Sequence, residues 1–474
     1  MLFHTPEFFL LLIVTLMLFY TFPKWRLYII ALANMLFYGV SGWGFLVLFL
    51  AVTTLTYYGS LLLQGRYGKI FLWLIVGVNL CNLFFFKYSV FFMQNLGKML
   101  DMQLVTENSF WLTIVLPIGI SFYTFEFISY SVDVYKKKIK PAQSWIDFWI
   151  FVAFFAHLVA GPIMRGNEFL PQVEQIRSLK PKIYNFKMGA FFLMLGLFKK
   201  IMLADYLAEA VNKYFAHPEL LTGSQAWVVT YLFAFQIYYD FSAYSDMAIG
   251  IGYFFGLELP RNFLTPYLSA NATEFWRRWH ITLSSWIRDY IYIGLGGSRR
   301  GIPRKYFNLF LAMTLSGIWH GALWTFAIWG MFHGALLILH NLYMSMKQKL
   351  KLTWLDKSFI YRVIAVIVFF HLTCIGWVFF RIHDLQGSLE LLRRMLSPDA
   401  LAMPVGMKIY AIAVLGLFVF HILEHYLLTH SVKISAFWHK YFPSPVRAVA
   451  YAVLIVLVLL FMKEEETGFI YFQF

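Results

Sequence analysis

Residues 363–380 read VIAVIVFFHLTCIGWVFF, a run of eighteen residues without a charged side chain. Similar apolar runs begin at Phe8, Trp73 and Val449. A helix that crosses the hydrocarbon core of a bilayer needs roughly 20 mostly apolar residues, and about ten to twelve such segments fit into this chain. The sequence therefore predicts an all-α integral membrane protein with about 11 transmembrane helices.

The composition supports this fold class. Charged residues make up 13% of the chain and hydrophobic residues 60%, whereas soluble globular domains average about 25% charged residues. The net charge of +15 is concentrated in short basic loops. Because such loops stay on the cytoplasmic side, we expect residues 64–70 and 136–140 in the cytoplasm and the N-terminus outside. Since much of the charge is explained by topology, we expect no nucleic-acid partner.

The sequence gives little support for a metal site. The two cysteines, Cys81 and Cys374, lie inside apolar runs and supply too few ligands. Residues His421–His425 read HILEH, a pattern known from zinc peptidases, and two histidines four residues apart on a helix can share a metal. Such short patterns also arise by chance, and the flanking residues offer only His430 as a third ligand. We predict no metal and interpret this segment as a helix end carrying cations.

Three regions of the chain differ in their polar content. Residues 1–110 hold four apolar segments with few polar residues, which predicts a transmembrane scaffold. In residues 111–345, polar and ionisable side chains occur within or beside the apolar segments. Residues 346–474 return to plain apolar segments, interrupted by a loop from His383 to Val405 that contains an amphipathic stretch. Because ionisable groups inside a membrane usually pair, face a cavity or mark a functional path, we expect the chemistry in residues 111–345.

Four stretches of this middle region carry the ionisable residues. They contain Glu126, Asp133, His157, Asp240, Asp246, Glu274, His280, His320 and His333. Glu126 and Asp133 are seven residues apart and share one face of a predicted helix. A hydrogen bond between helices would explain any one of these residues alone. Their concentration in one part of the chain predicts a shared polar interior.

The segment from Thr273 to Lys305 differs from a spanning helix. Its tryptophans recur at helical spacing while its arginines lie on other faces, a pattern typical of a helix at the membrane interface or one re-entering the membrane. The following stretch, GLGGSRRGIPRK (294–305), is glycine-rich and basic. It is interpreted either as a cytoplasmic anchor or as a site where arginines and backbone N–H groups bind phosphates. The candidate phosphate ligands are Arg277, Arg278 and Arg288.

Five motifs in this order resemble the bacterial branch of the membrane-bound O-acyltransferases, which O-acetylates alginate, cellulose and other exopolysaccharides. The motifs are LPIGISFYTFEFISY (116–130), HLVAGPIMR (157–165), YYDFSAYSDMAIGIG (238–252), FWRRWHITLSSWIRDYIYIGLGG (275–297) and SGIWHGALWTFAIWG (316–330). The D-alanyl transferases of teichoic acid synthesis are more distant members. The resemblance implies a bundle of spanning and re-entrant or interfacial helices around a central tunnel, with residues 111–345 as its catalytic core, in a multi-pass protein of the bacterial inner membrane.

The resemblance also implies the roles of two histidines. The WHG motif makes His320 the catalytic histidine of the family, and the RRWH motif makes His280 the second one, beside the tunnel. A neutral imidazole suits a general base, because acyl transfer to a hydroxyl requires removal of the hydroxyl proton. For His333, structural hydrogen bonding and tunnel lining both remain open. The residues expected to line the tunnel are Trp319, Asp240, Asp246, Glu126 and His333.

The predicted function is transfer of an acetyl group from a cytoplasmic thioester, acetyl-CoA, to an exopolysaccharide. The transfer is either direct or relayed through a periplasmic acetyltransferase of the SGNH-hydrolase kind, and a polymer synthase or secretion complex is a further expected partner. We expect no permanently bound cofactor, while a covalent acyl-enzyme intermediate remains open. The alternative class is a transporter or flippase of a lipid-linked substrate. Such folds often contain inverted repeats, and the sequence shows no matching halves.

Overall fold

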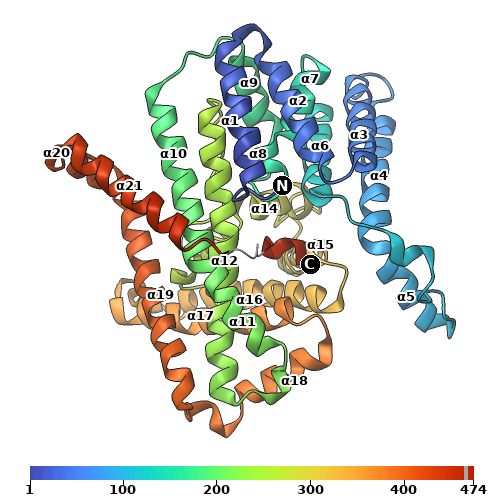
Figure 1. Cartoon of the computed structure of the whole chain (residues 1–474). Helices are drawn as coiled ribbons and strands as arrows, with labels where there is room; N and C mark the ends of the chain where they lie inside the picture. Colours follow the sequence, from blue (N-terminus) through green and yellow to red (C-terminus); the bar gives the residue numbers. More distant parts are fainter. Residues whose placement is uncertain (464–467, 474) are drawn as a thin grey trace. The chain divides into compact units, whose positions relative to one another are not determined.

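The computed structural model describes residues 1–463 and 468–473, and all regular secondary structure within them is helical (Figure 1). This confirms the predicted all-α class. The chain forms two compact units, of which unit 1 holds Met1–Leu195 with Tyr244–Pro260 and unit 2 holds Gly196–Ala243 with Arg261–Phe474. The units are defined by contacts and cut across the ranges 1–110, 111–345 and 346–474, which remain a prediction from polar content.

Unit 1 is built from helices of the first part of the chain. They are α1 (Pro6–Thr21), α2 (Arg26–Gly39), α3 (Trp43–Leu61), α4 (Gly68–Leu83), α5 (Ser89–Leu100), α6 (Ile120–Tyr135), α7 (Trp145–Ala153), α8 (Phe155–Leu158) and α9 (Gly166–Ile176). Arg26 is buried at the start of α2 and donates to the carbonyl oxygens of Phe19, Ile176 and Leu179 at 3.2, 3.3 and 2.7 Å. Since a buried cation must be satisfied, these bonds fasten α2 to the segments at the ends of α1 and α9.

Unit 2 contains the remaining helices, while α10 (Ile183–Phe198) and α12 (Gly223–Phe254) contribute residues to both units. Its helices are α11 (Asp205–Phe215), α13 (Ala272–Trp276), α14 (Ile281–Trp286), α15 (Ile302–His320), α16 (Trp324–Lys349), α17 (Phe359–Arg381), α18 (Leu385–Met395), α19 (Val405–Thr429), α20 (Ser431–Tyr441) and α21 (Ser444–Leu460). Short π- and 3₁₀-helical turns complete it, among them η4 (Lys199–Ala204), η7 (Ile287–Tyr292) and η10 (Ile470–Gln473).

Helices α15 and α16 form a tight hairpin that positions the WHG motif (319–321). Gly317 on α15 faces Gly330 on α16, and a Cβ on Gly317 would lie 2.8 Å from the Cα of Gly330. Only glycine allows this approach of two backbones. Helix α15 ends at His320, and α16 starts at Trp324 after a short connection. The close packing therefore holds His320 beside the first turns of α16.

The segment 273–290 is not one continuous helix. Helix α13 ends at Trp276, α14 begins at Ile281, and η7 follows. His280 lies at the break with φ +42° and ψ 56°, a left-handed conformation that is unusual for a residue other than glycine. The side-chain oxygen of Asn262 accepts from the backbone N–H of Thr282 at 3.2 Å and from its hydroxyl at 2.7 Å. These bonds to another segment of unit 2 hold the start of α14 in place.

Within the described residues, five helical segments are long and apolar enough to cross a membrane, and seven if each of two bent pairs counts as one span. They are Trp43–Leu61, Gly68–Leu100, α16, α17 and α19, and the bent pairs are α1 with Pro23–Gly39 and α20 with α21. The predicted number of about 11 stays a prediction. Helices such as α6 and α10 have 16 residues each, fewer than the roughly 20 of a complete span.

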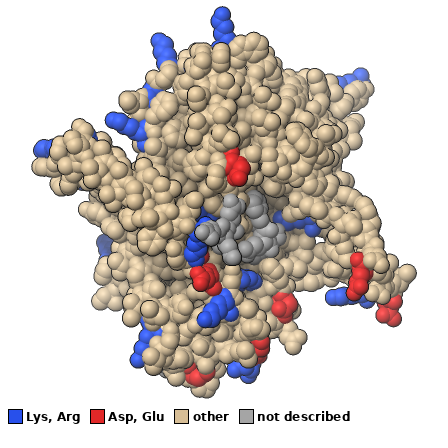
Figure 2. Space-filling model, in the orientation of Figure 1, with Lys and Arg blue, Asp and Glu red and all other residues tan. Residues whose placement is uncertain are grey.

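The surface agrees with a membrane protein. Figure 2 shows a face on which most atoms belong neither to Lys or Arg nor to Asp or Glu. Large apolar side chains on several helices are widely exposed, including Leu10, Trp73 and Ile409. Extended apolar surface of this kind marks contact with lipid or with another protein.

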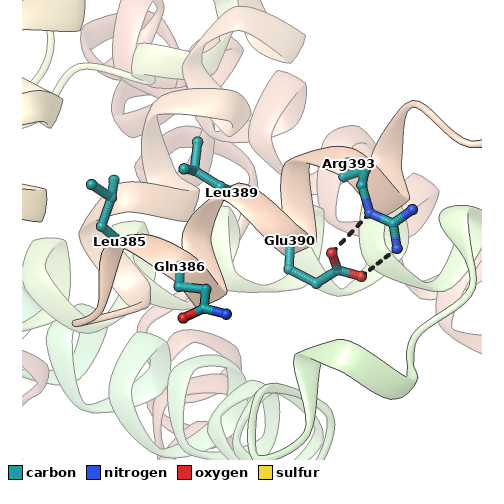
Figure 3. Close-up of a pocket in the computed structure, with 5 residues that line it drawn as sticks. All are labelled: Leu385, Gln386, Leu389, Glu390 and Arg393. Atoms are coloured by element: carbon teal, nitrogen blue, oxygen red, sulfur yellow. Dashed lines mark hydrogen bonds and ion pairs between the residues drawn. The ribbon is translucent and has the colours of Figure 1, made fainter.

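The amphipathic stretch in the loop from His383 to Val405 forms helix α18. Its buried face carries Leu391 and Met395. On its other side, Leu385 and Leu389 line a shallow open cavity, and Glu390 binds Arg393 (Figure 3). The helix thus has one buried apolar face, and its interfacial location stays a prediction.

Candidate active site

His320, the last residue of α15, lies in an aromatic cage. Its side chain is buried. Four ring centroids lie close to that of the imidazole, at 5.0 Å for Trp319, 5.1 Å for Trp329, 5.2 Å for Phe380 and 5.5 Å for Tyr471. We call these four residues the aromatic cage. Rings packed this closely limit access of water to the imidazole.

His280 is fully buried and contacts the cage through Trp319. Its ring centroid lies 6.3 Å from that of Trp319 and 4.7 Å from that of Phe241 on α12. His280 lies outside the candidate spans, and burial lowers its pKa to about 3. Its imidazole is therefore neutral at physiological pH.

His333 lies on α16, on the other side of Trp329. The centroid of Trp329 is 4.8 Å from that of His333 and 5.1 Å from that of His320, so this indole contacts both histidines. Phe275 stacks on the ring of His333 at 5.8 Å. Neither ring nitrogen of His333 has a hydrogen-bond partner among the described residues. The structure thus brings His280, His320, His333 and Trp319 together in unit 2, while their individual roles remain predictions.

Sequence reasoning named Trp319 but missed three residues of the cage, Trp329, Phe380 and Tyr471, of which Tyr471 lies farthest from the others in the sequence. Besides His320, its ring contacts those of Phe241 at 4.5 Å, Phe380 at 6.2 Å and Phe469 at 5.6 Å. The available signal was the aromatic run FIYF (469–472) after a charged stretch. A run of aromatic residues near a chain end does not indicate which part of the fold it contacts.

Asp240 precedes Phe241 on α12, and its carboxylate already has hydrogen-bond partners. One carboxylate oxygen accepts from the ammonium of Lys200 at 2.8 Å, and the other from the backbone N–H of Ile470 at 2.7 Å. Lys200 also pairs with Asp205 at 2.8 Å. The carboxylate expected to line a tunnel therefore fastens the segment that contains Tyr471.

Two expected site residues, Glu126 and Asp246, belong to unit 1. One carboxylate oxygen of Glu126 accepts from the backbone N–H of Met164 at 3.0 Å and lies 3.4 Å from Nε2 of His157. Both side chains of the Glu126–His157 pair are buried. Asp246 is half-buried on α12.

The three arginines expected to bind phosphates differ in their surroundings. Arg278 donates to Glu274 at 2.8 Å, and Arg288 to its neighbour Asp289 at 2.7 Å. Arg277 is exposed at the break between α13 and α14. Carboxylates beside Arg278 and Arg288 would therefore compete with a phosphate for these side chains. Arg277 is exposed to solvent, so its guanidinium is accessible to a ligand.

The HILEH residues on α19 serve different partners. Glu424 pairs with Lys199 at 2.6 Å and accepts from the hydroxyl of Tyr238 at 2.8 Å. The ring of His425 lies 2.8 Å from the hydroxyl of Thr265. In the part of the chain that the structure describes, no group of three His, Cys, Asp or Glu side chains is arranged to hold a metal ion.

The sequence profile of the membrane-bound O-acyltransferase family matches residues 61–380. The chain is 39% identical over 380 residues to the probable alginate O-acetylase AlgI of Pseudomonas aeruginosa, covering 79% of this chain and 70% of the relative. It is 35% identical over 410 residues to the peptidoglycan O-acetyltransferase of Helicobacter pylori, covering 81% and 75%. Identity to the teichoic acid D-alanyltransferase of Bacillus subtilis is 26% over 274 residues, covering 56% and 68%.

The chain therefore belongs to the membrane-bound O-acyltransferase family and is an acyltransferase. The matched residues 61–380 contain all five motifs that carry the resemblance. The prediction of an acyltransferase, rather than a transporter, is confirmed.

Proposed function

We propose that this acyltransferase moves an acetyl group from acetyl-CoA in the cytoplasm to hydroxyl groups of an exopolysaccharide, alginate-like or cellulose-like, at the bacterial inner membrane. The observation that carries the proposal is the buried His320 in its aromatic cage. The relatives named as O-acetylases of alginate and of peptidoglycan support acetyl as the acyl group and a glycan as the acceptor.

In the proposed reaction, the oxygen of an acceptor hydroxyl attacks the carbonyl carbon of the thioester. The C–O bond forms, the C–S bond breaks, and coenzyme A leaves as its thiolate. His320 removes the hydroxyl proton as attack proceeds and passes it to the leaving sulfur. A positioned general base of this kind contributes about 10²–10⁴-fold to the rate.

The aromatic cage suits this chemistry because a thioester must react with the hydroxyl and not with water. Packed rings exclude water, which suppresses hydrolysis and strengthens every electrostatic interaction inside the site. His280, which is neutral and contacts the same Trp319, supports the site from the α13–α14 break.

The donor is proposed to enter a tunnel from the cytoplasm, with its phosphates on the basic segment Arg277–Lys305. Arginine–phosphate hydrogen bonds are charge-assisted and often bidentate. Because Arg278 and Arg288 already bind carboxylates, Arg277 should contribute most. His333 is proposed to line the tunnel.

Delivery to the polymer is proposed to be direct or to pass through a periplasmic acetyltransferase of the SGNH-hydrolase kind, next to a polymer synthase. The test uses the purified full chain with acetyl-CoA labelled in the acetyl group and alginate or cellulose oligosaccharides. Labelled ester on the oligosaccharide, with release of free thiol, is the expected result. Thiol release that requires a partner protein would favour the relay, and the absence of both products with any partner would overturn the proposal.

A further inference from the structure

The segment from Gly468 to Tyr471, which we call the tail segment, is held in unit 2 by a buried ion pair. The backbone N–H of Ile470 donates to Oδ2 of Asp240 at 2.7 Å. Lys200, which pairs with Oδ1 of the same carboxylate at 2.8 Å, also donates to the carbonyl oxygen of Gly468 at 3.4 Å. Both partners of the ion pair thus bind the backbone of the tail segment.

These hydrogen bonds lie in a buried environment, where water cannot take the place of a lost partner. The side chains of Asp240 and Lys200 are only 4% and 1% exposed, and Phe469 and Ile470 are buried. A buried carboxylate that loses a hydrogen-bond donor keeps the full desolvation penalty of its charge. The tail segment is therefore held by polar bonds in addition to the packing of its aromatic rings.

The ring of Phe241 connects the region of the ion pair to the histidines. Phe241 follows Asp240 directly on α12, and its ring contacts that of Tyr471 at 4.5 Å and that of His280 at 4.7 Å. Tyr471 in turn packs on His320. A bond to the backbone at Ile470 therefore sets where the neighbouring Tyr471 ring lies relative to His320.

We propose that Asp240 and Lys200 are positioning residues for acyl transfer. They hold the tail segment so that Tyr471 closes the aromatic cage around His320. The proposal deepens the proposed function and rests on His320 as its catalytic base. It assigns to Asp240 an indirect role, through the backbone of Ile470, in place of direct lining of a tunnel.

Unit 2 offers a matched control for this role. Lys199 precedes Lys200 in η4 and pairs with Glu424 at 2.6 Å. This second ion pair is also largely buried, with side chains 5% and 10% exposed. Glu424 also accepts from the hydroxyl of Tyr238 and lies 3.3 Å from Nδ1 of His421. Glu424→Gln therefore disturbs a comparable ion pair on the adjacent lysine.

Two variants release the tail segment by different routes. In Asp240→Asn one of the two carboxylate oxygens is replaced by an NH₂ donor, so the two positions that accept from Lys200 and from Ile470 can no longer both be acceptors. Ile470→Pro removes the backbone N–H and leaves the buried ion pair intact. If Asp240→Asn does not fold, Ile470→Pro still tests the proposal.

The first measurement follows the position of the tail segment without using activity. Ile470→Cys keeps the backbone N–H and places a thiol at a buried position, in a chain where the exposed Cys81 is replaced by serine. We expect maleimide to label this thiol at least tenfold faster when Asp240→Asn is added, and no faster when Glu424→Gln is added. Equal labelling rates with and without Asp240→Asn would overturn the proposal.

The second measurement follows acetyl transfer. We expect Asp240→Asn, Ile470→Pro and Tyr471→Ala each to lower kcat at least tenfold with an unchanged KM for acetyl-CoA, while Glu424→Gln changes kcat less than twofold. The kcat of the double variant Asp240→Asn with Tyr471→Ala should be no lower than that of the less active single variant, because both substitutions act through one contact. Losses that multiply, or faster labelling with unchanged kcat, would overturn the positioning role. If the unmodified chain transfers no acetyl group, the proposed function fails, and the labelling result still decides whether Asp240 holds the tail segment.

Discussion

Two buried histidines in this chain have opposite surroundings. In unit 1, His157 lies 3.4 Å from the carboxylate of Glu126, which also caps the backbone N–H of Met164. In unit 2, His320 is surrounded by the rings of the aromatic cage. His157 thus has an acidic side chain as its neighbour, whereas the neighbours of His320 in the cage are aromatic rings. Burial alone therefore does not identify a catalytic histidine, and its neighbours are more informative.

The largest effect is expected at the cage. His320→Gln keeps a polar side chain but has no basic nitrogen near neutral pH, so kcat for acetyl transfer should fall by about 10²–10⁴-fold. Thermal unfolding should remain close to that of the unmodified chain. His371→Gln is the control, since His371 lies on α17 in the same unit and binds the hydroxyl of Tyr231 at 2.8 Å. Substantial transfer by well-folded His320→Gln would move the base to His280 or to a partner protein.

The next largest effect is expected from loss of the Tyr471 ring. Among the four rings of the cage, only that of Tyr471 carries a hydroxyl group. Tyr471→Ala removes the ring that closes the cage and should lower kcat at least tenfold, whereas the phenylalanine keeps this ring packing, so we expect kcat and the melting temperature of Tyr471→Phe to stay close to those of the unmodified chain. A fall in kcat for Tyr471→Phe as large as that for Tyr471→Ala would contradict a role through the ring.

The same substitution at His157 sharpens the comparison. His157→Gln removes the partner of a buried carboxylate, which should lower the free energy of unfolding by about 1–3 kcal/mol. Activity should then fall only as far as the amount of folded protein falls. Denaturation curves and the kcat per folded molecule separate the two effects. A kcat loss as large as that of His320→Gln would remove the distinction between the two sites.

A smaller effect is expected for the donor-binding arginines. Arg277→Ala should raise the KM for acetyl-CoA by about tenfold, the equivalent of one charge-assisted hydrogen bond. Arg288→Ala should have less effect, because this side chain already binds Asp289. Initial rates at varied acetyl-CoA provide the measurement. Unchanged KM values in both variants would make the basic segment a topology anchor only.

The smallest effect lies outside both histidine sites, on α18. Hydrogen bonds from Arg393 and Arg394 lower the pKa of Glu390 to about 2. A carboxyl group with a lowered pKa stabilises the fold above its unfolded-state value, and this contribution disappears as the pH falls toward 2. Glu390→Gln should therefore lower the melting temperature slightly at pH 7, and the difference should shrink as the pH is lowered from 5 to 3. A constant difference across this range would exclude the ion pairs as its cause.

The sequence predicted features that neighbouring residues encode together. The apolar runs predict the helical membrane class, because burying a helix in lipid depends on its own composition. The WHG and RRWH motifs indicate His320 and His280, and the structure brings both to Trp319. The count of about 11 spans and the roles of the candidate residues remain predictions, since length and composition support five to seven spans in the described residues.

Other features depend on residues that are far apart in the chain. Tryptophan spacing predicts one helix across 273–290, but the hydrogen bonds from Thr282 to Asn262 and the left-handed His280 divide it. Asp240 has the sequence signature of a tunnel residue, and only the fold shows Lys200 and the tail segment on its two oxygens. A helical period reports which face of a segment is apolar. The partner of a buried charge, in contrast, is set by tertiary packing. Because Asp240 binds the backbone of Ile470, the tertiary structure also decides that the neighbouring Tyr471 lies against His320.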